Sequence, residues 1–113
     1  EKGFRELLLQ TRQQLPKLQL VLCEPFILKV GGVKDKWEAY STEMAQRQEI
    51  VKRLSRENNA IFVPFQSVFN KALERAPAEY WMWDGIHPMP AGHELMAREW
   101  LHQVTKKLHF NNL

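Results

Sequence analysis

The sequence predicts an α/β protein in which helices cover both faces of a parallel sheet. Two short, mostly apolar runs, at residues 18–23 and 60–65, alternate with longer segments of helical apolar spacing. Near-continuous apolar strands are typical of parallel sheets buried on both sides. Only two such strands are present, whereas a doubly wound sheet usually has about five or six. We therefore expect the chain to be the second half of a larger α/β unit.

The first half of the chain predicts a helix, a strand and a second, longer helix. Apolar side chains recur at helical spacing over residues 3–15, until Pro16 closes the segment. The run at 18–23 ends abruptly at Glu24-Pro25, as a buried strand does. Gly31 and Gly32 mark a loop. A helix is then expected from Asp35, which can cap it, to about Asn59, with an apolar stripe at Trp37, Tyr40, Met44, Val51 and Leu54.

The second half predicts a strand, a helix, a loop and a last helix. The strand is the run at 60–65, and helical spacing follows from Val68 up to Pro77. The loop occupies residues 78–90. A last helix is expected over residues 91–108, with four apolar side chains one above another: Ala97, Leu101, Val104 and Leu108.

Composition narrows the function classes. The 113 residues are 44% hydrophobic, which is enough for one small core, and the net charge of +3 comes from interspersed basic and acidic side chains. That pattern argues against a nucleic-acid partner. No apolar run approaches the ~20 residues that span a bilayer. The single cysteine excludes an internal disulfide. Because the chain begins with Glu1 and not Met, we expect a segment to precede it.

The loop at 78–90 holds an acid and a base at a suggestive spacing. In a serine hydrolase, histidine takes the nucleophile's proton through one ring nitrogen, and a carboxylate at the other nitrogen fixes its tautomer. Asp84 and His87 are three residues apart, so a single turn can bring them together. Gly85 removes a side chain from this turn, and Pro88 disfavours the αR region at His87. The loop follows the last strand-helix unit, so the pair is expected over the carboxyl ends of the strands.

Several stretches resemble the SGNH, or GDSL-type, esterases and acylhydrolases. The segment WDGIHPMPAGHELMA at residues 83–97 resembles that family's last motif block, in which an Asp-x-x-His-Pro turn supplies the acid and base of the triad. LCEPF at 22–26, AIFVP at 60–64 and APAEYW at 76–81 resemble the branch that contains small-ester and carbohydrate acetyl esterases. The resemblance implies a three-layer, flavodoxin-like doubly wound parallel sheet, of which residues 1–113 are the C-terminal half of a single SGNH hydrolase domain.

The resemblance also implies roles and partners. Asp84 would orient His87, and His87 would activate a serine and later protonate the leaving alcohol. The substrate would be a small ester or an acetylated carbohydrate, with no metal or organic cofactor. The family's nucleophile lies in a Gly-Asp-Ser turn in the first half of the fold, and no serine here follows a Gly-Asp pair: Ser41, Ser55 and Ser67. We therefore expect this chain to be inactive without its missing N-terminal half.

Aromatic residues and the other histidine of the motif admit more than one interpretation. Trp81 and Trp83 can line a substrate pocket or anchor the loop in the core, and the sequence leaves both open. His93, at the start of the last helix, is expected to be structural or at the surface. A metal site of Asp84, His87 and His93 is disfavoured, because no second histidine follows His93 at helical spacing.

The remaining candidates are expected to be structural. Trp37 and Trp100 should pack at helical spacing, Cys23 should be a small core residue of a buried strand, and His102 and His109 should have no catalytic role. Glu24 is either a pocket residue or the partner of a cation.

If the chain is half of a sheet, its first strand should leave an unpaired edge and an uncovered apolar face. It should then associate with the missing half or with itself, as a homo-oligomer or an aggregate. The alternative functions are a non-catalytic α/β interaction module and, less supported, a basic nucleic-acid binder. The sequence determines neither the acyl and alcohol specificity nor the compartment.

Overall fold

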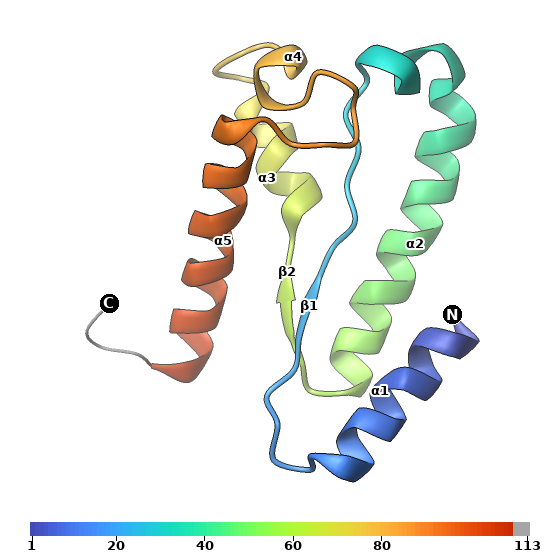
Figure 1. The fold of residues 1–113 in the computed structure, drawn as a ribbon, viewed down its shortest axis with the longest axis vertical. Helices are drawn as coiled ribbons and strands as arrows, with labels where there is room; N and C mark the ends of the chain where they lie inside the picture. The colour runs from blue at the N-terminus through green and yellow to red at the C-terminus, as the bar shows by residue number, and fades with distance from the viewer. Residues whose placement is uncertain (110–113) are drawn as a thin grey trace.

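The computed structural model describes residues 1–109 and contains a short parallel sheet flanked by helices (Figure 1). β1 and β2 run parallel, with Val21 opposite Ile61 and Cys23 opposite Val63. The predicted α/β class with a parallel sheet is thus confirmed. In chain order the elements are α1 (Lys2–Gln14), β1 (Val21–Cys23), the 3₁₀ helix η1 (Gly31–Lys36), α2 (Trp37–Glu57), β2 (Ile61–Val63), α3 (Phe65–Ala72), α4 (Ala78–Trp81) and α5 (Pro90–Leu108).

The helices lie on two sides of the strand pair. α1 and α2 are on one side of the strands and α5 is on the other, while α3 continues from the end of β2 and packs beside α5 (Figure 1). Leu8 of α1, Leu22 of β1 and Leu54 of α2 form one buried cluster, which explains why these three elements pack together. The molecule measures 43 × 38 × 17 Å, so it is a flat slab. None of the helices within residues 1–109 is long and apolar enough to cross a membrane.

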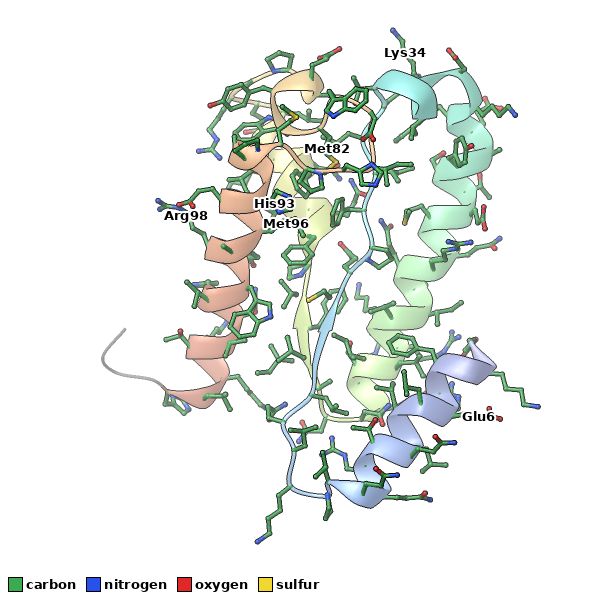
Figure 2. The ribbon with its side chains drawn as sticks, in the orientation of Figure 1. Glu6, Lys34, Met82, His93, Met96 and Arg98 are labelled. Carbon is green, nitrogen blue, oxygen red and sulfur yellow. The ribbon has the colours of Figure 1, made fainter. Side chains whose placement is uncertain are left out.

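A second buried cluster lies beyond the carboxyl ends of the strands. Met82, which follows α4, and Met96 of α5 lie on the side of α5 that faces the strands. Arg98 of α5 points away from the cluster (Figure 2). The ring of Phe26, in the segment that continues β1, packs 4.9 Å from that of Phe69 in α3. This cluster supports the turn between α4 and α5. Its buried members are Leu28, Val30, Phe69, Ala72, Trp81 and Met82.

The element boundaries correct several predictions. Both strands are three residues long, shorter than the runs at 18–23 and 60–65. Pro64 has no N–H for a ladder, and α3 begins directly after it. Residues 31–36 form η1, not a loop, so α2 begins at Trp37 and Asp35 does not cap it. The predicted loop at 78–90 contains the single turn of α4.

Exposure corrects the predicted role of several apolar residues. Cys23 is exposed, not a core residue, because α5 packs on β2 and leaves this part of β1 open. Partial burial still raises the pKa of the Cys23 thiol, so it is not an activated nucleophile. Trp100 and Leu101 on α5 are also exposed, as are Ala97 and Leu108 of the predicted stripe. The helix packs through other side chains: Leu95, Met96 and Val104. Within the described residues β1 has one unpaired edge, as expected.

Candidate active site

The turn that carries the predicted acid and base connects α4 to α5. It lies at the end of the molecule toward which both strands run (Figure 1), against residues 24–30, which extend β1. The Leu28 N–H donates a hydrogen bond of 3.0 Å to the carbonyl oxygen of Gly85. The pair therefore lies over the carboxyl ends of the strands, where sites of open α/β sheets are found.

Two glycines allow the turn to pack this closely. Gly85 has φ +87°, and a Cβ there would lie 2.6 Å from the Leu28 carbonyl oxygen and 2.8 Å from that of Val30. Gly31 has φ +56°, and its Cβ would lie 2.6 Å from the Cα of Asp84. Both positions combine left-handed backbone with direct backbone contact, a requirement that only glycine meets without strain. The sequence predicts only a loop at Gly31, because the contact with Asp84 is between residues far apart in the chain.

Asp84 holds the turn through both of its carboxylate oxygens. Oδ1 accepts hydrogen bonds from the N–H groups of Ile86, at 2.9 Å, and His87, at 2.8 Å. Oδ2 lies 2.5 Å from Nδ1 of His87. These hydrogen bonds lower the pKa of Asp84 from 3.8 to about 2. The backbone N–H of His87 has the largest effect, followed by the His87 ring and the backbone N–H of Ile86. The carboxylate is therefore ionised throughout the neutral range.

His87 presents its second ring nitrogen for chemistry. Its side chain is 78% exposed, and among residues 1–109 Nε2 has no hydrogen-bond partner. With Nδ1 donating to Asp84, the neutral ring carries its proton on Nδ1 and leaves the Nε2 lone pair available. This is the arrangement of a general base oriented by a carboxylate.

The two tryptophans have different environments. Trp81 is buried: its indole N–H donates to the Ala76 carbonyl at 3.1 Å, and its own carbonyl accepts from Met89 at 2.8 Å. Arg75 lies 5.7 Å from its ring centroid. Trp81 therefore anchors the loop, whereas Trp83, directly before Asp84, is 63% exposed.

The other candidates lie outside the pair. His93 is exposed on the first turn of α5, and within the described residues no three His, Cys, Asp or Glu side chains gather as metal ligands. His102 and His109 are exposed near the far end of α5. Glu24 caps α3, since its carboxylate accepts the Gln66 N–H at 2.8 Å. Burial raises the pKa of Glu24.

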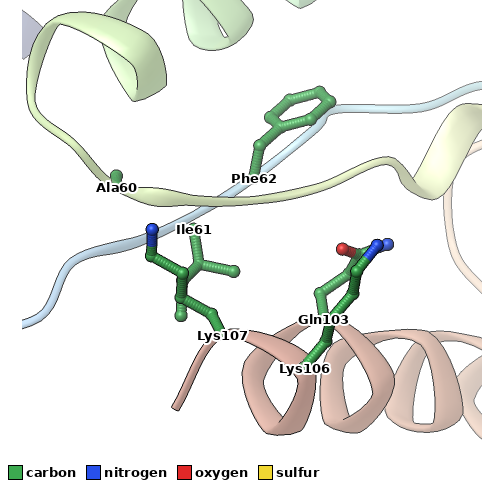
Figure 3. Close-up of a pocket in the computed structure, with 6 residues that line it drawn as sticks. All are labelled: Ala60, Ile61, Phe62, Gln103, Lys106 and Lys107. Atoms are coloured by element: carbon green, nitrogen blue, oxygen red, sulfur yellow. The ribbon is translucent and has the colours of Figure 1, made fainter. Parts of the chain in front are cut away.

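One cavity adjoins the turn that carries Asp84 and His87, and another lies far from it. One of about 330 Å³ adjoins the turn through Ile86 and is otherwise lined by Ile27, Val33, Tyr40, Glu43, Met44 and Arg47. The other, of about 300 Å³, lies between the start of β2 and the last turns of α5 (Figure 3). Ile61 points toward α5 there, beside Lys107, whereas Lys106 lies beside Gln103 and Phe62 points away (Figure 3). The second cavity has no carboxylate or imidazole and is remote from Asp84, so it is not part of this site.

Comparison with known proteins yields one family. Residues 1–95 match the model of the GDSL-like Lipase/Acylhydrolase family. An acetylxylan esterase from Geobacillus stearothermophilus is 31% identical over 104 residues, which are 92% of this chain and 45% of that protein. The chain thus spans about half the length of the curated relative that it matches. The chain belongs to the GDSL-like Lipase/Acylhydrolase family.

Solved structures agree with this assignment. A crystal structure described as a GDSL-like lipase from Parabacteroides merdae has a TM-score of 0.83 and 42% identity, over 90% of this chain and 46% of that chain. The Geobacillus acetylxylan esterase has a TM-score of 0.72 and 31% identity, over 89% and 43%. Structures of that enzyme include alanine variants, described as catalytic mutants, of a serine, an aspartate and a histidine three positions after the aspartate. In another variant the tryptophan directly before that aspartate is replaced.

Proposed function

We propose that this member of the GDSL-like Lipase/Acylhydrolase family supplies the acid-base pair of a serine ester hydrolase. Asp84 is the orienting acid and His87 is the general base. The observation that carries the proposal is the 2.5 Å contact between Asp84 Oδ2 and His87 Nδ1, which leaves Nε2 free. The Geobacillus enzyme has its named aspartate and histidine at the same separation of three positions, which supports the assignment.

The pair would act on a serine that lies outside residues 1–113. Nε2 of His87 takes the hydroxyl proton as the serine oxygen attacks the acyl carbon, and Asp84 stabilises the imidazolium that forms. His87 then gives the proton to the oxygen of the leaving alcohol as the bond between that oxygen and the acyl carbon breaks. The alcohol departs and an acyl-serine remains. In the second half, His87 takes a proton from water as the water oxygen attacks the acyl carbon. It then returns that proton to the serine oxygen as the acyl–serine bond breaks, which releases the carboxylic acid and restores the serine. The chain alone should be inactive, because it provides neither the nucleophile nor the oxyanion donors.

The fold fits half of a domain. Its radius of gyration is 15.6 Å, whereas a compact domain of this length has about 13 Å. The rest of a doubly wound, flavodoxin-like sheet would pair with the free edge of β1 and cover the open apolar side chains. Several large apolar side chains are exposed on α1, on α5, directly after α3 and in the segment before β1: Leu7, Leu9, Leu15, Leu18, Leu73, Trp100, Leu101 and Leu108.

The proposed substrate is a small ester or an acetylated carbohydrate. The second class is supported by the name of the Geobacillus relative, an acetylxylan esterase. Trp83 offers an exposed indole face one residue from Asp84, and sugar rings pack well on such faces. In the complete domain, Trp83→Ala should raise KM for an acetylated xylo-oligosaccharide more than for a small aryl acetate. An equal rise in KM for both substrates would show that Trp83 does not contact the carbohydrate.

A fluorophosphonate probe tests the proposed chemistry. Applied to the protein that carries this chain within its whole domain, the probe should label one serine outside residues 1–113, and His87→Ala should slow that labelling. Labelling of Ser41, Ser55 or Ser67, or no His87-dependent labelling at all, would contradict the proposal. The isolated chain should neither react with the probe nor hydrolyse a chromogenic acetate.

A further inference from the structure

Residues 24–30, against which the turn of Asp84 and His87 packs, extend β1 beyond the sheet without a partner strand. β2 ends at Val63 and Pro64 follows, so the chain that continues β1 loses its backbone ladder after the bond from Glu24 N–H to Val63. Farther along, the side-chain amide of Gln66 takes the place of a strand. The Ile27 N–H donates to Gln66 Oε1 at 2.9 Å, and Gln66 Nε2 donates to the Ile27 carbonyl at 3.0 Å. In an antiparallel ladder, the N–H and the C=O of one opposing residue would make the same two bonds.

All four hydrogen-bonding positions of this amide are used. Besides its two bonds to Ile27, Oε1 accepts from Gln48 Nε2 at 3.0 Å, and Nε2 donates to Asn70 Oδ1 at 2.9 Å. Gln48 Nε2 also donates to the Pro25 carbonyl at 2.9 Å, which fixes the orientation of the Gln48 amide. A flipped Gln66 amide would set donors against the Ile27 N–H and Gln48 Nε2. The network therefore permits one orientation of Gln66.

The two bonds between the Gln66 amide and Ile27 lie directly beside the turn of Asp84 and His87. The residue after Ile27 is Leu28, whose N–H holds the Gly85 carbonyl at 3.0 Å. Gly85 lies in the chain between Asp84 and the two residues, Ile86 and His87, whose backbone N–H groups donate hydrogen bonds to the Asp84 carboxylate. We infer that Gln66 is a positioning residue for the Asp84–His87 pair, which it holds in register through Ile27, Leu28 and Gly85. Its relevance to catalysis rests on the function proposed above, whereas its effect on the turn does not.

A carboxyl-carbon NMR titration of the chain labelled with ¹³C-aspartate tests this inference. The chain has two aspartates, so the exposed Asp35 serves as an internal reference for Asp84. In the wild type, the Asp84 resonance should stay nearly flat between about pH 3 and 5, because its pKa is about 2. In Gln66→Ala the turn loosens, the donors to Asp84 lengthen, and the Asp84 pKa should rise toward 3.8, so the resonance titrates in that window.

The matched control is Gln103→Ala. Gln103 is also a half-buried glutamine, and its amide donates to Glu99 within α5, away from residues 24–30. This variant should keep the Asp84 pKa at about 2 even if it lowers stability. A role in stability alone would move the melting temperature of both variants without changing the pKa of Asp84 in the folded chain.

The inference is overturned if folded Gln66→Ala keeps the Asp84 pKa at the wild-type value. Should Gln66→Ala not fold, Gln48→Ala decides, because it removes one donor to the same amide oxygen and leaves α3 intact. The Asp84 pKa should then rise in the same direction, and an unchanged value would refute the inference. None of these measurements requires turnover, so a failure of the ester hydrolase proposal is detected separately, by the serine probe.

Discussion

Replacement of Gly85 by alanine is the sharpest single test of how the turn is held. The residue has φ +87°, and an added Cβ would meet the Leu28 carbonyl at 2.6 Å, the Val30 carbonyl at 2.8 Å and the Val33 Cγ2 at 2.9 Å. Two of these three atoms belong to the backbone of the segment that extends β1. They cannot move away as the end of a flexible side chain would, so the turn itself must shift.

The expected cost has two parts. A left-handed conformation costs a residue with a Cβ about 1–2 kcal/mol, and overpacking of a tight interior contact costs about 1–3 kcal/mol. Together they give about 2–5 kcal/mol, a large part of the roughly 5–15 kcal/mol that stabilises a whole domain. The turn carries Asp84 and His87, so the same variant should also weaken their contact.

Urea unfolding followed by circular dichroism measures this loss, with Gly32→Ala as the matched control. Gly32 has no atom within 4 Å of its would-be Cβ and no positive φ. Alanine there should be neutral or stabilise by up to about 1 kcal/mol, through the unfolded state. If Gly85→Ala and Gly32→Ala unfold at the same urea concentration, the turn is not packed against residues 28–30 as described.

Three further variants test charge and exposure. The pKa of Asp84 is lowered to about 2 from 3.8, so its carboxylate stabilises the fold above about pH 4 and loses that effect as the pH falls through about 2. The stability gap between wild type and Asp84→Asn should close over this window in urea titrations, and a constant gap would contradict the assignment. Burial raises the pKa of Glu24 above 4.5. The wild type should therefore lose stability relative to Glu24→Gln as the pH rises beyond that value. A difference in stability that does not change with pH would refute the burial effect. Leu101→Ser, on the open face of α5, should change the unfolding free energy by less than about 0.5 kcal/mol yet reduce self-association in sedimentation, whereas a large loss of stability would mean that Leu101 is buried.

The sequence predicted the features that depend on local pattern. The three-residue separation of Asp84 and His87 was enough to predict their contact, because one turn brings them together. The order of strands and helices also followed from apolar spacing. Boundaries were less accurate where one residue decides them, as at Pro64, which ends β2.

Contacts between residues far apart in the chain could not be predicted from local sequence patterns. Nothing beside Gly31 in the sequence indicates that its backbone touches Asp84, and nothing beside Gln66 indicates a bond to Ile27. The exposure of Leu101 and Cys23 depends on what else covers the sheet, which apolar spacing does not report. Both are side chains that a fold completed by further strands would be expected to cover.

We propose that His87 is the base of an ester hydrolase completed by residues outside this chain. The measurement is kcat/KM for a chromogenic acetate in the protein that carries the whole domain, compared among wild type, His87→Ala and His93→Ala. His87→Ala should lower kcat/KM by about 10²–10⁴-fold, the range for loss of a general base. His93→Ala, which changes an exposed histidine six positions away, should leave it near the wild-type value. A His87→Ala variant that retains wild-type kcat/KM would contradict the claim.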